Sequence, residues 1–185
     1  MKFIISMLAV LMLAACSSTP QVLTVAPVLS LSQIKGASVP VELVISDQRA
    51  NTELLGYRNA KNQGEITFSE PLSKALGEAI QTELQNQGIQ MKKGPEPLTK
   101  LEIQVVELNY RSPDETWVSH IEMKAEILVS VTRGTTNIKK RFTANRSQDV
   151  ATAPTAEFNQ NYLNGMLSEL INKALNDSEI ANFLK

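Results

Sequence analysis

The stretch HIEMKAEILVSV, residues 120–131, decides the fold expected for this chain. Apolar side chains occupy every odd position from Ile121 to Val131, and polar or charged side chains occupy most of the even positions. Alternation over this length is typical of a β-strand with one face buried and the other in water. We therefore expect a long strand from Trp117 to Val131, in a sheet that has one covered face.

The segments on both sides of this strand extend the sheet. Residues 98–110 alternate through Ile103 and Val105 and then continue one position out of phase, which predicts a β-bulge. Further segments with strand character are 39–45, 54–58, 64–68 and 138–147. Residues 22–33 are too apolar for a free linker, so we expect them to lie along the domain in extended form, with an edge or bend at Pro27.

Two segments have the periodicity of amphipathic helices. The first has leucine or isoleucine at every fourth position, with Ser69 as its expected cap and Gly88 as its end. The second is expected from Thr155 to Leu175, and a short final turn follows Asp177. The order of elements predicts an α+β fold: one mixed, mainly antiparallel sheet with two amphipathic helices packed on one face.

The N-terminus has the pattern of an export signal. Lys2 is followed by thirteen residues in which Ser6 is the only polar one, and this run is shorter than the roughly 20 residues of a membrane-spanning helix. The run ends at Cys16, the only cysteine of the chain. Leu13 stands where an ordinary signal peptidase site needs a small residue, which argues against that type of cleavage.

Residues 13–16, LAAC, instead resemble the bacterial lipobox. The resemblance implies a diacylglyceryl thioether on Cys16 and a third acyl chain on its α-amine, and several acyl chains give a firm membrane anchor. Ser17, which is not Asp, then favours export to the outer membrane. The alternatives for Cys16 are a buried small residue or a free thiol. We expect a signal peptide at 1–15, the lipidated cysteine with a tether at 16–21, and a single periplasmic domain at 22–185.

Composition excludes several classes of protein. Without residues 1–15 the chain has 17 basic and 19 acidic residues, so it has no basic surface of the kind that binds nucleic acid. Acylated Cys16 leaves no thiol for a disulfide or a metal site, and His120 is the only histidine. The common nucleotide-binding and hydrolase motifs are absent, so no cofactor is expected.

Few residues qualify as a site. Asp47, Gln48 and Arg49 follow a buried strand and are candidates for partner binding, while the alternative is a local ion pair and turn. His120 is expected on the polar face of its strand. The basic residues of segment 138–147 point to alternate sides, which suits a guarded sheet edge better than a patch for anionic headgroups or glycan; they are Lys139, Lys140, Arg141 and Arg146.

Several segments together resemble the YajG-type lipoproteins of Gram-negative bacteria. They are LAAC at 13–16, TVAPVLSL at 24–31, SDQR at 46–49, YRNAKNQGEITFSEPL at 57–72, LQNQGIQM at 84–91 and FL at 183–184. The resemblance covers most of the chain and implies a location and a fold, but no reaction.

We therefore expect a non-catalytic lipoprotein on the periplasmic face of the outer membrane, anchored through Cys16, that acts as an interaction or assembly module with an envelope protein partner. One alternative is a module that binds a lipid or cell-wall fragment in a cavity near the first helix. A hydrolase that uses only carboxylates such as Asp47 and Glu53 is the other.

Overall fold

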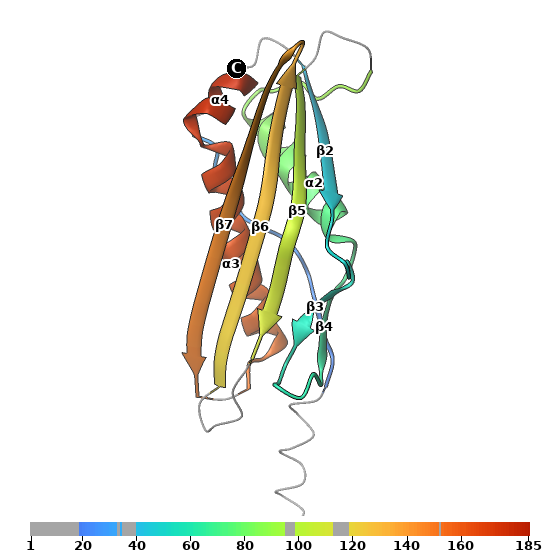
Figure 1. Ribbon diagram of the computed structural model, residues 1–185, viewed down its shortest axis with the longest axis vertical. Helices are drawn as coiled ribbons and strands as arrows, with labels where there is room; N and C mark the ends of the chain where they lie inside the picture. Colours follow the sequence, from blue (N-terminus) through green and yellow to red (C-terminus); the bar gives the residue numbers. More distant parts are fainter. Residues whose placement is uncertain (1–18, 33, 35–39, 95–98, 113–118, 152) are drawn as a thin grey trace, which may run out of the picture.

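The computed structural model describes residues 19–32, 34, 40–94, 99–112, 119–151 and 153–185. The elements in chain order are β1 Gln21–Leu23, β2 Val41–Asp47, β3 Leu54–Tyr57, β4 Glu65–Phe68, α2 Leu72–Asn86, β5 Thr99–Arg111, β6 Ser119–Arg133, β7 Thr136–Val150, α3 Ala156–Leu175 and α4 Ser178–Leu184. Figure 1 shows an elongated body in which the helices lie behind one twisted sheet. The predicted α+β architecture is confirmed, with the expected final turn forming a short third helix.

The seven strands form one mixed sheet in which β5 is the central element. The order is β1-β4-β3-β5-β6-β7, and β2 pairs with β5 outside this path. The two longest pairings, β5 with β6 and β6 with β7, are antiparallel. Both β2 and β3 run parallel to β5, with β2 alongside its first half and Gly56 of β3 opposite Tyr110 near its end.

A bulge in β5 keeps both halves of this strand in the core. The register with β6 shifts between Val105 and Glu107, at the position where the sequence pattern changes phase. Because a bulge adds one residue to one strand, Leu108 and Tyr110 point to the same face as Ile103 and Val105. All four side chains are buried. The predicted bulge is therefore confirmed.

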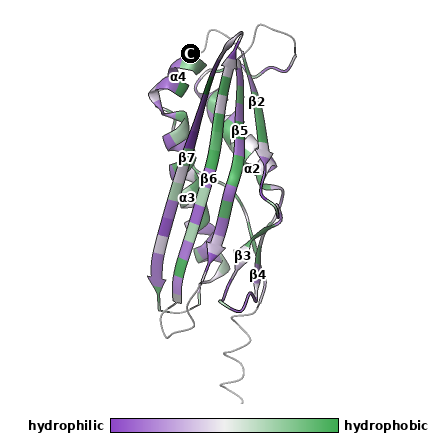
Figure 2. Ribbon diagram, viewed as in Figure 1, coloured by the Kyte–Doolittle hydropathy of each residue, from purple (hydrophilic) through white to green (hydrophobic). Residues whose placement is uncertain are grey.

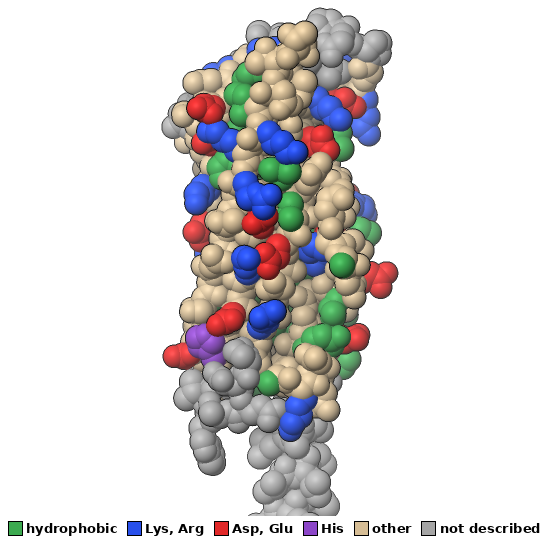
Figure 3. Space-filling model, in the orientation of Figure 1, with side chains coloured by type: hydrophobic (Ala, Val, Ile, Leu, Met, Phe, Trp, Pro, Cys, Tyr) green, Lys and Arg blue, Asp and Glu red, His purple; other side chains and the backbone are tan. Residues whose placement is uncertain are grey.

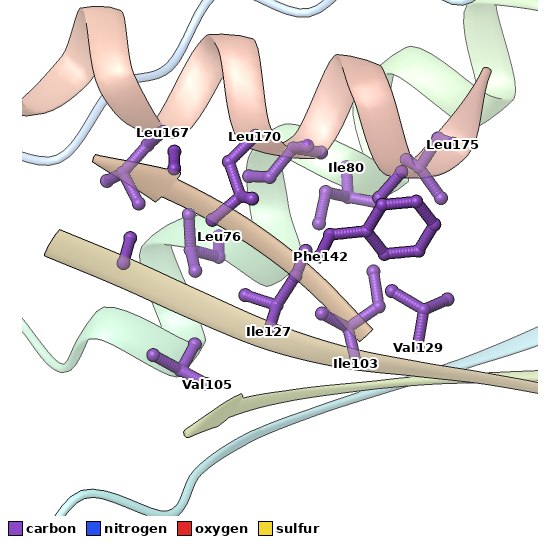
Figure 4. Packing of buried hydrophobic residues seen from close by; sticks show 14 of the residues in the cluster. Leu76, Ile80, Ile103, Val105, Ile127, Val129, Phe142, Leu167, Leu170 and Leu175 are labelled. Atoms are coloured by element: carbon purple, nitrogen blue, oxygen red, sulfur yellow. The ribbon is translucent and has the colours of Figure 1, made fainter. Parts of the chain in front are cut away.

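The core fills the space between the inner face of the sheet and the helices. Figure 4 shows Leu170 and Leu175 of α3 against Phe142 of β7, with Ile127 and Val129 of β6 beneath them. From α2, Leu76, Ile80 and Leu84 are also buried. Each fully buried leucine or isoleucine contributes about 1.5–3 kcal/mol, so these helix stripes hold the helices on the sheet.

The ends of the helices show one error in the prediction. Helix α2 begins at Leu72 after Pro71, and no side chain caps it, so Ser69 is not the cap. The reason is that Ser69 still belongs to the extended chain after β4, where its backbone N–H donates to the Leu23 carbonyl. At the other end, Gly88 has a φ of 81° and closes the helix in a left-handed conformation, as predicted. Thr155 caps α3 by accepting a hydrogen bond from the Phe158 amide.

The outer face of the sheet is polar. Figure 2 shows hydrophobic and hydrophilic bands alternating along β5 and β6, and Figure 3 shows acidic and basic side chains interspersed over this face. Charges meet across neighbouring strands: Lys124 with Glu107 at 2.6 Å, and Arg141 with Glu126. Opposite charges on adjacent strands stabilise the pairing of the strands. Charged side chains are also well solvated, so this face of the sheet is suited to contact with water.

Candidate functional site

The predicted cluster at the end of β2 is a buried ion pair. The side chains of Asp47 and Arg49 are 7% and 6% exposed. The two oxygens of Asp47 accept hydrogen bonds from Nε and Nη2 of Arg49 at 2.9 and 2.7 Å. The other donors of Arg49 bind the carbonyl oxygens of Thr52 at 2.7 Å, Leu54 at 2.9 Å and Leu108 at 3.3 Å. All five N–H groups of the guanidinium are therefore bound within the chain.

This arrangement gives Asp47 and Arg49 a structural role. Their contacts join the end of β2, the following turn, β3 and β5, and the guanidinium also lies 5.2 Å from the centre of the Phe68 ring. Both oxygens of Asp47 are bound by a fixed cation, an arrangement poorly suited to a general acid or base. Gln48 is exposed, so it is the member of the cluster most accessible to another molecule. Partner binding at 47–49 stays a prediction.

Two surface hollows lie near this ion pair. One, of about 580 Å³, lies at the start of α2 and is lined by Asp47, Glu53, Phe68, Glu70 and Ser73 among others. The other, of about 750 Å³, lies beside the bulge of β5 and includes Arg49, Gly56, Asn59, Glu107 and Asn109 in its lining. In the part of the chain described here, no group of three or more His, Cys, Asp or Glu residues is placed to hold a metal ion.

A second polar cluster fixes the start of the described chain. Arg58 donates to the carbonyl oxygen of Thr19 at 3.0 Å and to that of Pro154 at 3.1 Å. Gln21 also donates to the Pro154 carbonyl, at 3.0 Å, and accepts a hydrogen bond from the Asn159 amide at 2.7 Å. Arg58, Gln21 and Asn159 are all buried. Since buried polar groups rely on such bonds, this cluster holds the N-terminal segment in one position.

Tyr110 lies close to this cluster, and its burial makes the hydroxyl a weaker acid. Burial raises the pKa of the Tyr110 hydroxyl to about 12, although the nearby Asn159 and Arg58 act in the opposite direction. Desolvation dominates because the phenolate would be a charged group inside the core. The phenol is neutral at physiological pH, as an ordinary tyrosine is, and burial makes its ionisation still less favourable.

Residues 24–32 form an extended segment, here called the N-terminal strap, that is bound to α3 by a ladder of polar side chains. Every second backbone N–H donates to a side-chain oxygen: Thr24 to Gln160, Ala26 to Asn164, Val28 to Ser168, Ser30 to Asn172 and Ser32 to Asn176, all at 2.7–2.9 Å. Three side-chain amides donate back to strap carbonyls: Asn164 to Thr24, Asn172 to Val28 and Asn176 to Ser30. The side-chain amides of these asparagines bind the N–H and C=O groups of the strap, as the backbone of a neighbouring strand would.

The ladder is possible because the rise of two residues in the extended strap nearly matches the rise of four residues in α3. Two residues of extended chain advance about 6.6 Å, and four residues of an α-helix advance about 6.0 Å. Polar side chains every fourth residue on one face of α3 therefore stay level with every second residue of the strap. The odd residues of the strap are turned inward, so that Val25, Pro27 and Leu31 are buried. The predicted extended path of this segment is confirmed.

Comparisons with known proteins identify the family. The family model Lipoprotein_16, described as uncharacterized lipoprotein, matches residues 27–185. The chain belongs to this family. The match includes most of the strap and all elements from β2 to α4, and it confirms the lipoprotein class predicted from the sequence. It is also consistent with the resemblance to YajG-type lipoproteins.

Solved structures are similar to this lipoprotein to different degrees, and the first of the two below shares its fold. A Xanthomonas campestris protein of family DUF330 is similar with a TM-score of 0.60 and 10% identity, over 86% of this chain and 95% of that chain. The rare lipoprotein B of Shewanella oneidensis gives a TM-score of 0.37 and 10% identity, over 77% of this chain and 89% of that chain. No curated protein matches the sequence.

The remaining sequence-predicted residues of the lipoprotein lie apart from these clusters. His120 is on the open face, with Nδ1 2.6 Å from Asp149. The basic residues of β7 alternate as expected: Lys140 contacts Asp177 and Arg146 contacts Glu169 on the helix side, while Arg141 contacts Glu126 on the open side. The signal segment 1–15 and Cys16 are outside the described residues. Among the described helices, none combines the length and apolar character that crossing a bilayer requires.

Sequence reasoning missed the strap ladder, although its signal is visible. Polar side chains recur at every fourth position along the predicted second helix and at the residue after its end: Gln160, Asn164, Ser168, Asn172 and Asn176. A run of amide and hydroxyl side chains on one helix face is usually taken as a solvated surface. Here it pairs with backbone groups of the lipoprotein's own strap, which no pattern within the helix alone could indicate.

Removing amides from the ladder should loosen the strap. We expect Asn164→Ala and Asn172→Ala each to cost about 1 kcal/mol, because each change removes two hydrogen bonds while slightly favouring the helix. Hydrogen exchange should be faster at the Ala26 amide in Asn164→Ala and at the Ser30 amide in Asn172→Ala, with the amides of β6 unchanged. Lys173→Ala, on the exposed side of the same helix, is the matched control. Equal protection of the strap in all three variants would contradict the assigned role.

Proposed function

We propose that this lipoprotein is held at the periplasmic face of the outer membrane by acyl chains on Cys16, and that its body is a non-catalytic interaction or assembly module of the envelope. The observation that carries the proposal is the lipobox LAAC at 13–16 in a chain of a lipoprotein family. Three acyl chains would make a stable anchor without any membrane-spanning segment.

The chemistry of the described residues supports a non-catalytic role. Asp47, which lines one of the two hollows, has both oxygens bound to Arg49. On the open face, Lys124 pairs with Glu107 and Arg141 pairs with Glu126 across neighbouring strands. Catalytic groups must instead be able to reach a substrate and exchange protons near neutral pH. A surface of paired charges with an exposed Gln48 suits recognition of another protein better than a reaction.

The anchoring is tested by replacing the cysteine. Cys16→Ala alone could leave an uncleaved signal segment, since Leu13 disfavours ordinary signal peptidase. The double variant Leu13→Ala/Cys16→Ala creates an Ala-Ala-Ala site at 13–15 and should yield a soluble periplasmic protein. Membrane fractionation should find the wild type in the membrane pellet and the double variant in the soluble fraction. Mass spectrometry of the wild type should find the acyl mass on its first residue.

A matched variant separates anchoring from sorting. Ser17→Asp should keep the acyl mass but move the protein from the outer- to the inner-membrane fraction of a sucrose gradient. If the double variant stays in the pellet, or the wild type has no acyl mass, the anchoring proposal is wrong. If Ser17→Asp stays with the outer membrane, the sorting part alone is wrong.

A further inference from the structure

The path from the proposed anchor to the body is very short. Only three peptide units separate Cys16 from Thr19, whose carbonyl oxygen is bound by buried Arg58 at 3.0 Å. An extended chain advances at most about 3.6 Å per residue, so Thr19 lies no more than about 11 Å from the anchored residue. This argument rests on the proposed anchoring at Cys16 and concerns how the body is then placed.

The point where the chain enters the body is held firmly. β1 begins at Gln21, which pairs with Ile66 of β4. The Gln21 side chain is bound at both ends, through Pro154 and Asn159. The strap continues this attachment along α3 with its ladder of hydrogen bonds. Releasing more chain would break a buried polar network, so the three peptide units set the working length of the tether.

This entry point lies at one end of the long axis. Figure 1 shows the lower end formed by the turn between β3 and β4, the end of β5, the start of β6 and the end of β7; we call this end the base. The hairpin between β6 and β7, with α4, lies at the opposite or far end. β6 runs from one to the other with 15 residues, and at about 3.3 Å per residue it spans about 50 Å.

The sides of the body offer little to bind a bilayer. Among the described residues, the large apolar side chains that are exposed are Val22 at 61% and Val28 at 78%. Binding of a protein face to a membrane scales with the apolar area that it can insert, and two separate valines provide little. The open face of the sheet has paired charges of both signs. Nothing described on these sides would therefore hold the body flat on the lipid.

We propose that the body stands on the phospholipid headgroups with its base, and that the far end projects about 50 Å into the periplasm. The short tether keeps the base at the membrane surface, and the polar sides leave the long axis upright. The far end, with the β6–β7 hairpin and α4, is then the part of the body most distant from the membrane.

Fluorescence quenching tests this orientation in the intact lipoprotein. Acylation of Cys16 leaves no native thiol, so one introduced cysteine accepts the fluorophore alone. Ala60→Cys labels the base and Thr135→Cys labels the far-end hairpin; both residues are exposed. In vesicles of phosphatidylethanolamine and phosphatidylglycerol with a quencher on the headgroups, we expect the Ala60 label to be quenched at least fivefold more than the Thr135 label.

A longer tether is the control. Twenty Gly and Ser residues inserted between Ser18 and Thr19 have a mean span of about 25 Å, which should reduce quenching at position 60 to the level at position 135. Equal quenching of both labels with the native tether overturns the upright orientation, as does base quenching that the insertion leaves unchanged. Flotation of the same vesicles is measured in parallel. Protein that fails to float contradicts the anchoring itself, whereas floating protein with equal quenching contradicts only the orientation.

Discussion

Replacing Arg49 by Met should lower the free energy of unfolding by about 3–5 kcal/mol, because the change leaves the buried Asp47 carboxylate without its cation. Asp47 is 7% exposed, so water cannot take over the role of the guanidinium. The change also removes the hydrogen bonds to the carbonyl oxygens of Thr52, Leu54 and Leu108. Urea denaturation followed by circular dichroism measures the loss.

Three further variants make this result specific. Arg49→Lys keeps a positive charge but cannot form five directed hydrogen bonds. Its loss in the free energy of unfolding should therefore be more than half of the loss in Arg49→Met. The double variant Asp47→Asn/Arg49→Met should be more stable than Arg49→Met, because it leaves no unpaired charge in the interior. Gln48→Ala, at the exposed neighbour, should stay within about 0.5 kcal/mol of the wild type. A loss below about 1 kcal/mol for Arg49→Met would contradict the assigned structural role.

This ion pair also bears on the search for a partner. A variant of Asp47 or Arg49 that loses binding would also lose stability, so the result could not be assigned to a direct contact. Gln48 and Glu53 are exposed and are the better positions for a first test of recognition. Stability measurements on the same variants separate the two effects.

The features that could be predicted from the sequence are those that depend on the residue pattern within a single helix or strand. Alternation in β6, the change of phase in β5 and the apolar residue at every fourth position of α2 each report which side of that element is buried. The structure agrees with all three. The capped ends of α3 and α4 were predictable for the same reason, since a cap uses residues within a few positions of the helix.

Features that depend on two distant segments were not predictable in this way. The parallel pairing of β2 with β5 joins residues more than fifty positions apart, and alternation within β2 does not reveal its neighbour. The burial of Asp47 and Arg49 depends on Leu108, which lies on a different strand. The strap ladder likewise needs residues 24–32 and α3 together. In each case the pattern within one segment does not identify the distant segment that it contacts.

The second large effect is expected at Gly56, where two strands come unusually close. Gly56 of β3 lies opposite Tyr110 of β5, and a Cβ atom there would collide with the Tyr110 carbonyl oxygen, with the carbonyl carbon at 3.0 Å. A backbone atom inside the sheet cannot move aside as a flexible side chain can. Gly56→Ala should therefore separate β3 from β5 and cost about 3 kcal/mol, the upper end of the usual cost of overpacking.

Gly77→Ala is the matched control, because the substitution is the same and only the surroundings differ. Gly77 lies within α2, where an added Cβ would have Ile45 Cγ1 at 3.6 Å, an ordinary contact. Alanine favours a helix over glycine, so this variant should gain about 0.5–1 kcal/mol. Thermal and urea unfolding should thus shift in opposite directions for the two variants. Equal stability of Gly56→Ala and the wild type would contradict the close approach of β3 to β5 at this position.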